Sequence, residues 1–268
     1  MEDFLIIFIS FLLIMGIINI YKTKTSKVKY IESNLYDDNN DEYLVRFNEG
    51  TIPTDINNNC DAGANALSFM RENLIELVNR VKQEQCPNDK CTVPTDDEQK
   101  KRKGMQLIKE SELQQLIERF NPDNISESAH DDKYTSYSVN KGEKVIFCIR
   151  EKDGQHKNEI INVNTLMFVA IHELAHIMTT SIGHGEDFWN NMRYLLSVAI
   201  ITPAKKNYRD NCNFKKKIQS DLTTSIPTYD SNNQMIYYYE DYSKPDKQTA
   251  YCGDDITTTP CNDNTCKI

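Results

Sequence analysis

The sequence has no surplus of basic residues. Lys and Arg number 31 against 40 Asp and Glu, which gives a net charge of −9 and an isoelectric point near 5.1. Neutralisation of phosphates by Lys and Arg supplies most of the non-specific affinity of proteins for nucleic acid. The charge balance therefore argues against a large nucleic-acid-binding surface, and we do not expect nucleic acid as a partner.

Histidine is also scarce. The chain has five histidines in 268 residues, so a chance His-Glu-x-x-His motif would be rare, about one in a hundred chains of this composition. Three of the histidines nevertheless lie close together, at His172, His176 and His184. This clustering favours a shared function. His130 and His156 stand in polar segments, where we expect solvent-exposed loops.

The apolar content limits the size of the fold. With 39% hydrophobic residues, the chain can bury one good-sized core rather than two, so we expect one main domain. That domain is predicted over residues 61–204. Residues 22–60 are polar and predict a linker, and residues 205–268 predict a cysteine-containing extension that packs on the domain.

Helical and strand patterns follow one another within this domain. Asp61 can cap a helix that runs to about residue 83, and a shorter helix is expected over 105–120. Strand formers over 134–139 and 144–150 predict a strand pair, because a turn signal over 140–142 separates them. Further helices are expected from Asn164 or Thr165, and over 186–201.

The helix expected from Asn164 or Thr165 carries the strongest motif in the sequence. His172 and His176 are four residues apart in an apolar run, which places both imidazoles on one face of a helix. Zinc binds neutral imidazole nitrogens, and a hydrolytic site keeps three protein ligands and an open position for water. Glu173 is rotated about a quarter turn from the histidine line, so it can accept a proton from a zinc-bound water.

The third ligand is expected to be His184, which Gly183 and Gly185 bracket. Gly183 can end the helix in a left-handed cap and return the chain toward the metal. The alternative is that the two histidines of the helix are ordinary core or surface residues, since short patterns have false positives. The predicted site is Zn²⁺ held by His172, His176 and His184, with Glu173 as the catalytic residue.

An apolar run over residues 4–20 is at the short end of what spans a bilayer. It follows Glu2 and Asp3 and is succeeded by several lysines, which favours an uncleaved anchor over a signal peptide. We therefore predict a transmembrane anchor over residues 1–21 and a single-pass membrane location. The lysines place the main domain on the cytosolic side.

The eight cysteines give a conflicting indication. Cys86 with Cys91, and Cys261 with Cys266, have spacings that suit disulfides or a second zinc site, and we favour disulfides. Cys148 stands in an apolar strand, where a buried free thiol is expected. Disulfides are rare in reducing cytosol, so either the topology is inverted, or the thiols are free, or a dedicated oxidation pathway acts there.

Three stretches resemble a known family: YSVNKGEKVIFCIR, NTLMFVAIHELAHIM and GHGEDFW. Over about residues 136–196 the chain resembles the WLM-type and SprT-like zinc metallopeptidases, most closely their relatives in large DNA viruses. The resemblance implies that His172, His176 and His184 bind zinc and that Glu173 is catalytic. It also implies that Phe188 and Trp189 pack the following helix against the site.

The resemblance further implies an α+β, zincin-like domain, in which a small mixed sheet lies beside two active-site helices. An edge strand, expected over 144–150, would take a peptide by main-chain hydrogen bonds. Tyr194, Tyr208 and the tyrosines of the carboxyl-terminal tail are candidate donors to the reacting carbonyl oxygen, and the sequence does not select one of them.

The combined prediction is a membrane-anchored zinc metallopeptidase. It would hydrolyse peptide bonds by Glu-assisted attack of a zinc-bound water, with a protein or peptide as substrate, and reside in a host or virion membrane through residues 4–20. One alternative is a non-catalytic virion-envelope or structural protein that retains a zinc-binding zincin fold. Another is a protease that acts on DNA-bound proteins.

Overall fold

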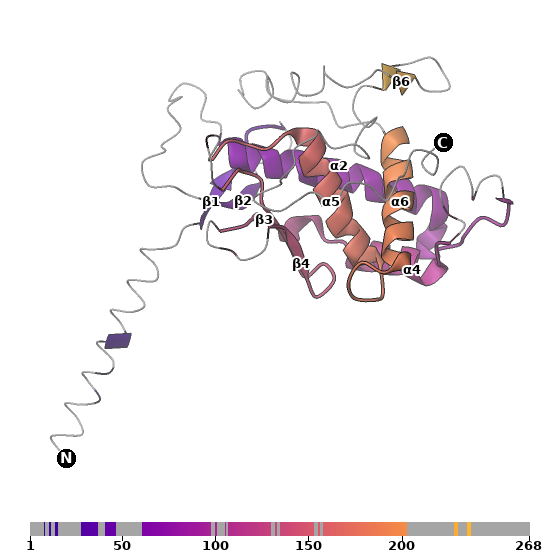
Figure 1. Cartoon of the computed structure of the whole chain (residues 1–268), viewed down its shortest axis with the longest axis horizontal. Helices are drawn as coiled ribbons and strands as arrows, with labels where there is room; N and C mark the ends of the chain where they lie inside the picture. Colours follow the sequence, from indigo (N-terminus) through magenta and orange to yellow (C-terminus); the bar gives the residue numbers. More distant parts are fainter. Residues whose placement is uncertain are drawn as a thin grey trace.

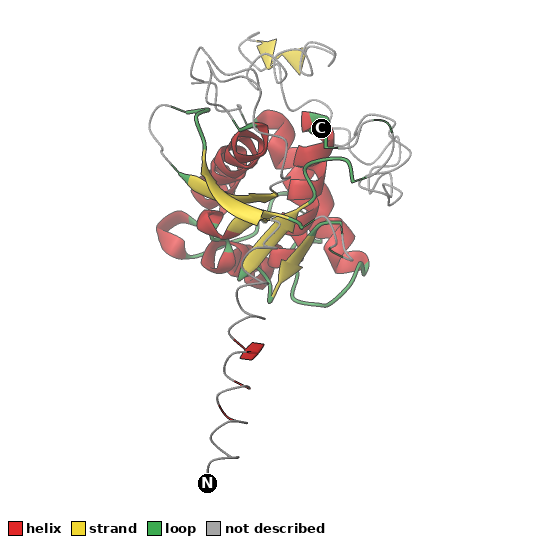
Figure 2. Ribbon diagram, turned by 90° about the vertical axis from the view of Figure 1, so that its left-hand side faces the viewer, coloured by secondary structure: helices red, strands yellow, loops and turns green. Residues whose placement is uncertain are grey.

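The computed structural model describes residues 28–36, 41–46, 61–97, 107–129, 135–152 and 158–202, with a few shorter pieces. The shorter pieces are residues 8, 11, 14–15, 100, 105, 132, 155, 228–229 and 235–236. Within these residues the chain has a mixed α/β architecture, with four α-helices and three small sheets (Figures 1 and 2). His130, His156, Tyr208 and the pair Cys261 and Cys266 lie outside the described residues.

The predictions of an N-terminal transmembrane helix and of a single-pass membrane location are corrected. Within the described part of the chain, no helix combines the length and the apolar character needed to cross a membrane. The longest, α2 (Ala62–Gln85), carries charged side chains such as Arg71, Glu72 and Arg80. Of residues 4–20 the structure describes only Phe8, Phe11, Ile14 and Met15, and the rest of that predicted span lies outside the described residues.

Helix α2 supplies a large part of the core. The Asp61 side chain accepts hydrogen bonds from the backbone N–H groups of Gly63 and Ala64, at 2.8 and 3.0 Å, so it caps the helix as predicted. Apolar residues such as Leu67, Met70 and others along α2 are buried, and the helix contacts both α5 (Val163–Met178) and α6 (Glu186–Ile201). Helices α5 and α6 therefore both pack against α2.

The central sheet has three strands in the order β3, β5, β4. Strand β3 (Ile125–Glu127) is parallel to β5 (Lys144–Phe147), and β4 (Tyr137–Val139) is antiparallel to it. The predicted strand pair and its turn are confirmed, and all three turn residues have positive φ. The predicted edge position of residues 144–150 is wrong, because β3 pairs with the other side of β5. Strand β4 is an edge strand instead.

Part of the segment predicted as a linker is folded. Strands β1 (Val28–Glu32) and β2 (Glu42–Arg46) form an antiparallel pair, and β2 contacts both β3 and α2. Tyr43 and Val45 are buried on alternate positions of β2, which is the pattern of a half-buried strand. The polar residues around this short pattern concealed it in the sequence.

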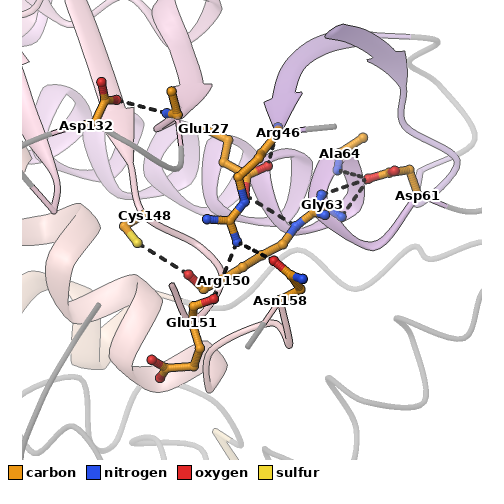
Figure 3. Close-up of polar contacts among 11 residues, drawn as sticks. Arg46, Asp61, Gly63, Ala64, Glu127, Asp132, Cys148, Arg150, Glu151 and Asn158 are labelled. Atoms are coloured by element: carbon orange, nitrogen blue, oxygen red, sulfur yellow. Dashed lines mark hydrogen bonds and ion pairs between the residues drawn. The ribbon is translucent and has the colours of Figure 1, made fainter. Parts of the chain in front are cut away.

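A buried ionic cluster joins this strand pair to the rest of the domain (Figure 3). The Glu127 carboxylate lies 3.7 Å from Nε of Arg46 and 3.3 Å from Nε of Arg150, and it accepts the backbone N–H of Arg46 at 2.7 Å. Arg150 also reaches the Asp61 carboxylate at 3.5 Å. Arg46 and Glu127 are both almost completely buried. The cluster therefore connects β2, β3, the chain after β5 and the start of α2.

The remaining described elements are short or peripheral. Helix α4 (Glu110–Arg119) contacts α5, and its extent is less than the predicted 105–120. Two single 3-10 turns, η1 (Pro87–Asp89) and η2 (Pro122–Asn124), begin with prolines. Strands β6 (Thr228–Tyr229) and β7 (Met235–Ile236) pair in the carboxyl-terminal region.

The predicted disulfide between Cys86 and Cys91 is confirmed. It closes the chain just after α2. Cys148 is also disulfide-bonded, so the expectation of a free thiol there is wrong. Its apolar surroundings bury it as predicted, and its partner cysteine lies outside the described residues.

Candidate metal centre

The structure brings the three predicted ligands together. His172 and His176 project from α5, and His184 reaches them from the loop between α5 and α6, two helices that lie side by side in Figure 1. One ligand nitrogen from each histidine lies within 4.8 Å of the others, and the Nε2 atoms of His172 and His184 are 3.0 Å apart. Among the described residues this is the group of side chains that could hold a metal ion.

The loop that carries His184 differs in detail from its prediction. Helix α5 ends at Met178, with the cap Thr179 in an extended conformation, so Gly183 does not cap the helix. Gly183 has φ 88° inside the loop, directly before His184. Gly183 therefore changes the chain direction immediately before His184 rather than at the end of the helix. At the other end of α5 the cap is Asn162 rather than the two predicted residues.

Two aromatic side chains of α6 pack on the histidines. Phe188 is fully buried, and its ring centroid lies 4.4 to 4.9 Å from those of all three histidines. Trp189 stacks on His184, with centroids 5.8 Å apart and an interplanar angle of 27°. These contacts restrict the orientation of the imidazole rings, because each ring meets an aromatic face or edge.

Burial keeps the histidines of α5 neutral. Desolvation, together with the neighbouring histidines, lowers the pKa of His172 to about 3. Desolvation, His184 and Lys141 lower the pKa of His176 to about 4. Burial also lowers the pKa of His184. Since a metal binds the neutral imidazole, the site is ready to accept a cation at neutral pH without releasing protons from these two residues.

This neutrality predicts weak competition between protons and the metal. A site of three histidines with ordinary pKa values near 6.5 would bind a metal ion roughly 10³-fold more weakly at about pH 5.5 than at about pH 7.5, because protons occupy the ligand nitrogens. With the pKa values of His172 and His176 well below that window, we expect a loss of at most about 10-fold. Competition with a chromophoric chelator at both pH values measures it. A loss approaching three orders of magnitude would contradict the burial of these rings.

Glu173 is placed for acid–base chemistry. It follows His172 on α5 and is 4% exposed. Burial raises its pKa to about 8, although a hydrogen bond with the backbone of Ser138 on β4 opposes the shift. Its Oε2 atom is buried and has no hydrogen-bond partner. A carboxyl group with a raised pKa and one unsatisfied oxygen can exchange a proton near neutral pH.

The donor set fits a tetrahedral metal ion. Zinc binds histidine nitrogens at about 2.0–2.1 Å, which places two ligand nitrogens about 3.3 Å apart in a tetrahedral site. The nitrogens of His172 and His184, 3.0 Å apart, are near that spacing, and all three ligand nitrogens lie within 4.8 Å of one another. Three neutral imidazoles leave the fourth position for water or substrate.

Sequence reasoning missed the contributions of β4 and of the turn that follows it. Ser138 contacts Glu173, and Lys141 contacts the histidine loop, yet both are distant in sequence from the motif. Tyr194, a candidate donor, is fully buried, and the charge that acts on its hydroxyl is that of Glu84 on α2. It is therefore a core residue in this structure.

Comparisons with known proteins give viral relatives. No family model matches the chain, and no solved structure matches it. The chain is 35% identical over 99 residues to an uncharacterized protein of Acanthamoeba polyphaga mimivirus, which covers 35% of the chain and 48% of the relative. It is 38% identical over 81 residues to one of Invertebrate iridescent virus 3, covering 27% and 48%, respectively.

A third relative, from Invertebrate iridescent virus 6, is 33% identical over 64 residues, which is 24% of the chain and 35% of that protein. The chain thus spans about half the length, or less, of the relatives it matches. None of these three relatives has a described activity. Function is therefore inferred from the geometry of the site.

Proposed function

We propose that the protein is a zinc-dependent metallopeptidase. The observation that carries the proposal is the convergence of His172, His176 and His184, together with the buried carboxyl group of Glu173, the residue after His172 on α5, whose pKa is raised. The sequence resemblance to WLM-type and SprT-like metallopeptidases supports it. When bound, zinc would supply a Lewis acid that polarises a carbonyl group and makes water more acidic.

The protein groups then have distinct tasks. The three histidines hold the ion, and Phe188 packs against each of their rings. Glu173 accepts a proton from the attacking water and returns it to the leaving amine. The backbone of Ser138 holds the Glu173 carboxyl group in place by a hydrogen bond.

Strand β4 offers a place for the substrate backbone. It is an edge strand of the central sheet, it contacts α5, and Ser138 within it touches Glu173. An extended peptide can pair with such an edge by main-chain hydrogen bonds, which gives affinity with loose sequence preference. We therefore propose a protein or peptide in extended conformation as the substrate.

The test combines metal analysis with a cleavage assay on the full chain. We expect about one zinc per chain, and cleavage of unfolded protein substrates that a chelator abolishes and added zinc restores. Zinc at that ratio without cleavage of any substrate would overturn the peptidase proposal and leave a metal-binding protein. Absence of bound zinc would overturn the metal site as well.

A further inference from the structure

The loop between α5 and α6 has little packing of its own. Every residue from Thr180 to Glu186 is exposed, and Ile182 at its tip is 95% exposed. A side chain at Gly183 would meet no atom within 4 Å. The His184 ring packs on Phe188 and Trp189, whereas the loop backbone that precedes it is held by polar contacts of the neighbouring residues.

The principal contact comes from Lys141, in the turn between β4 and β5. Its ammonium group donates hydrogen bonds to the carbonyl oxygens of Thr179, at 2.7 Å, and Ser181, at 2.5 Å. Lys141 has φ 57°, so its backbone is in the left-handed conformation within the turn. Hydrogen bonds from a charged donor are stronger than those between neutral groups. One side chain therefore joins the end of α5 to the middle of the loop.

A second contact closes the other side of the loop. The Ser181 hydroxyl donates to the Asp187 carboxylate at 2.6 Å, and that carboxylate also accepts the backbone N–H of Phe188 at 2.9 Å. Ser181 is thus held through its carbonyl by Lys141 and through its hydroxyl by Asp187. Ser181 is in this way fixed between the central sheet and α6, and the chain continues from it through Gly183 to His184.

We propose that Lys141 is a positioning residue that holds the His184 loop at the metal. This inference deepens the proposed function, since it rests on the three-histidine site being a zinc site. It does not depend on catalysis, because Lys141 acts on the backbone of the loop. Residues that orient metal ligands from outside the ligand set typically contribute about 10–100-fold to metal affinity.

The experiment measures zinc affinity by chelator competition on the full chain. We expect K141M to weaken affinity by about 10–100-fold and K141R to retain most of it. In an H184A background, the same K141M change should have no further effect, because the ligand that Lys141 positions is gone. A merely structural role would weaken both backgrounds equally, and that result would overturn the proposal, as would wild-type affinity in K141M.

Gln115 gives a matched control. Its side-chain amide donates to the carbonyl oxygens of Ile177 and Thr179, at 2.7 and 3.1 Å, at the same end of α5, without reaching Ser181. We expect Q115M to change zinc affinity by less than about 3-fold. Should K141M fail to fold, K141Q takes its place under the same criteria. If the wild-type protein binds no zinc, both the proposed function and the role of Lys141 are overturned. If it binds zinc but cleaves no substrate, only the peptidase proposal fails, and the effect of K141M on zinc affinity still tests the role of Lys141.

Discussion

E173Q is expected to lower kcat for peptide cleavage by about 10²–10⁴-fold, the usual contribution of a positioned general base. Glutamine has nearly the same shape as the carboxyl group and can still accept the Ser138 hydrogen bond, but it cannot take a proton from water. Because Glu173 is not among the three ligands, zinc content should remain at the wild-type level. Steady-state kinetics and metal analysis on the same preparation measure both.

Glu186 provides the control for this substitution. It is an exposed glutamate in the first turn of α6, two residues from His184 in the chain. We expect E186Q to leave kcat within about 3-fold of wild type, because an exposed charge adds little. Full activity in E173Q, or an equal loss in both variants, would refute the assignment of Glu173 as the proton acceptor.

E127A is expected to lower the free energy of unfolding by about 3–5 kcal/mol. Glu127 is 3% exposed and lies beside both Arg46 and Arg150, so its removal takes a carboxylate away from two guanidinium groups, one of which, that of Arg46, belongs to a residue only 2% exposed. The backbone N–H of Arg46 also loses its acceptor. Such a loss is a large part of the stability of a typical domain, which is about 5–15 kcal/mol. Urea denaturation with the disulfides intact measures it.

The matched control is D123A. Asp123 also pairs with an arginine, Arg71, at 2.8 Å, but its side chain is 73% exposed. Exposed ion pairs contribute about 0–1 kcal/mol, so we expect a change within that range. If E127A and D123A cost the same, the buried cluster does not hold the strand pair β1–β2 to the domain.

Local signals in the sequence sufficed for some elements. Asp61 is a strong cap, and α2 follows it with a regular apolar face. Helix α6 has the predicted bounds, since Gly185 precedes it and Thr202-Pro203 follows it. The histidines were found because four-residue spacing fixes their common face whatever surrounds the helix. In each case residues close in sequence determine the result.

Features that depend on distant partners were not predictable. Strand β3 has only three residues and owes its strand conformation to pairing with β5. Cys148 is disulfide-bonded, whereas the apolar residues around it in the sequence indicated a free thiol. The contacts of Ser138 and Lys141 likewise require that the β4–β5 hairpin lie against α5. Such placements follow from tertiary packing, which a single sequence does not display.

The unequal support of the three histidines has a consequence for metal exchange. His172 and His176 are fixed on a buried helix, whereas His184 lies on an exposed loop. If the site holds zinc as proposed, we expect the loop ligand to detach first while the two helix ligands stay bound, and a metal to enter by the reverse order. The lifetime of the ion would then depend on the loop rather than on unfolding of the domain.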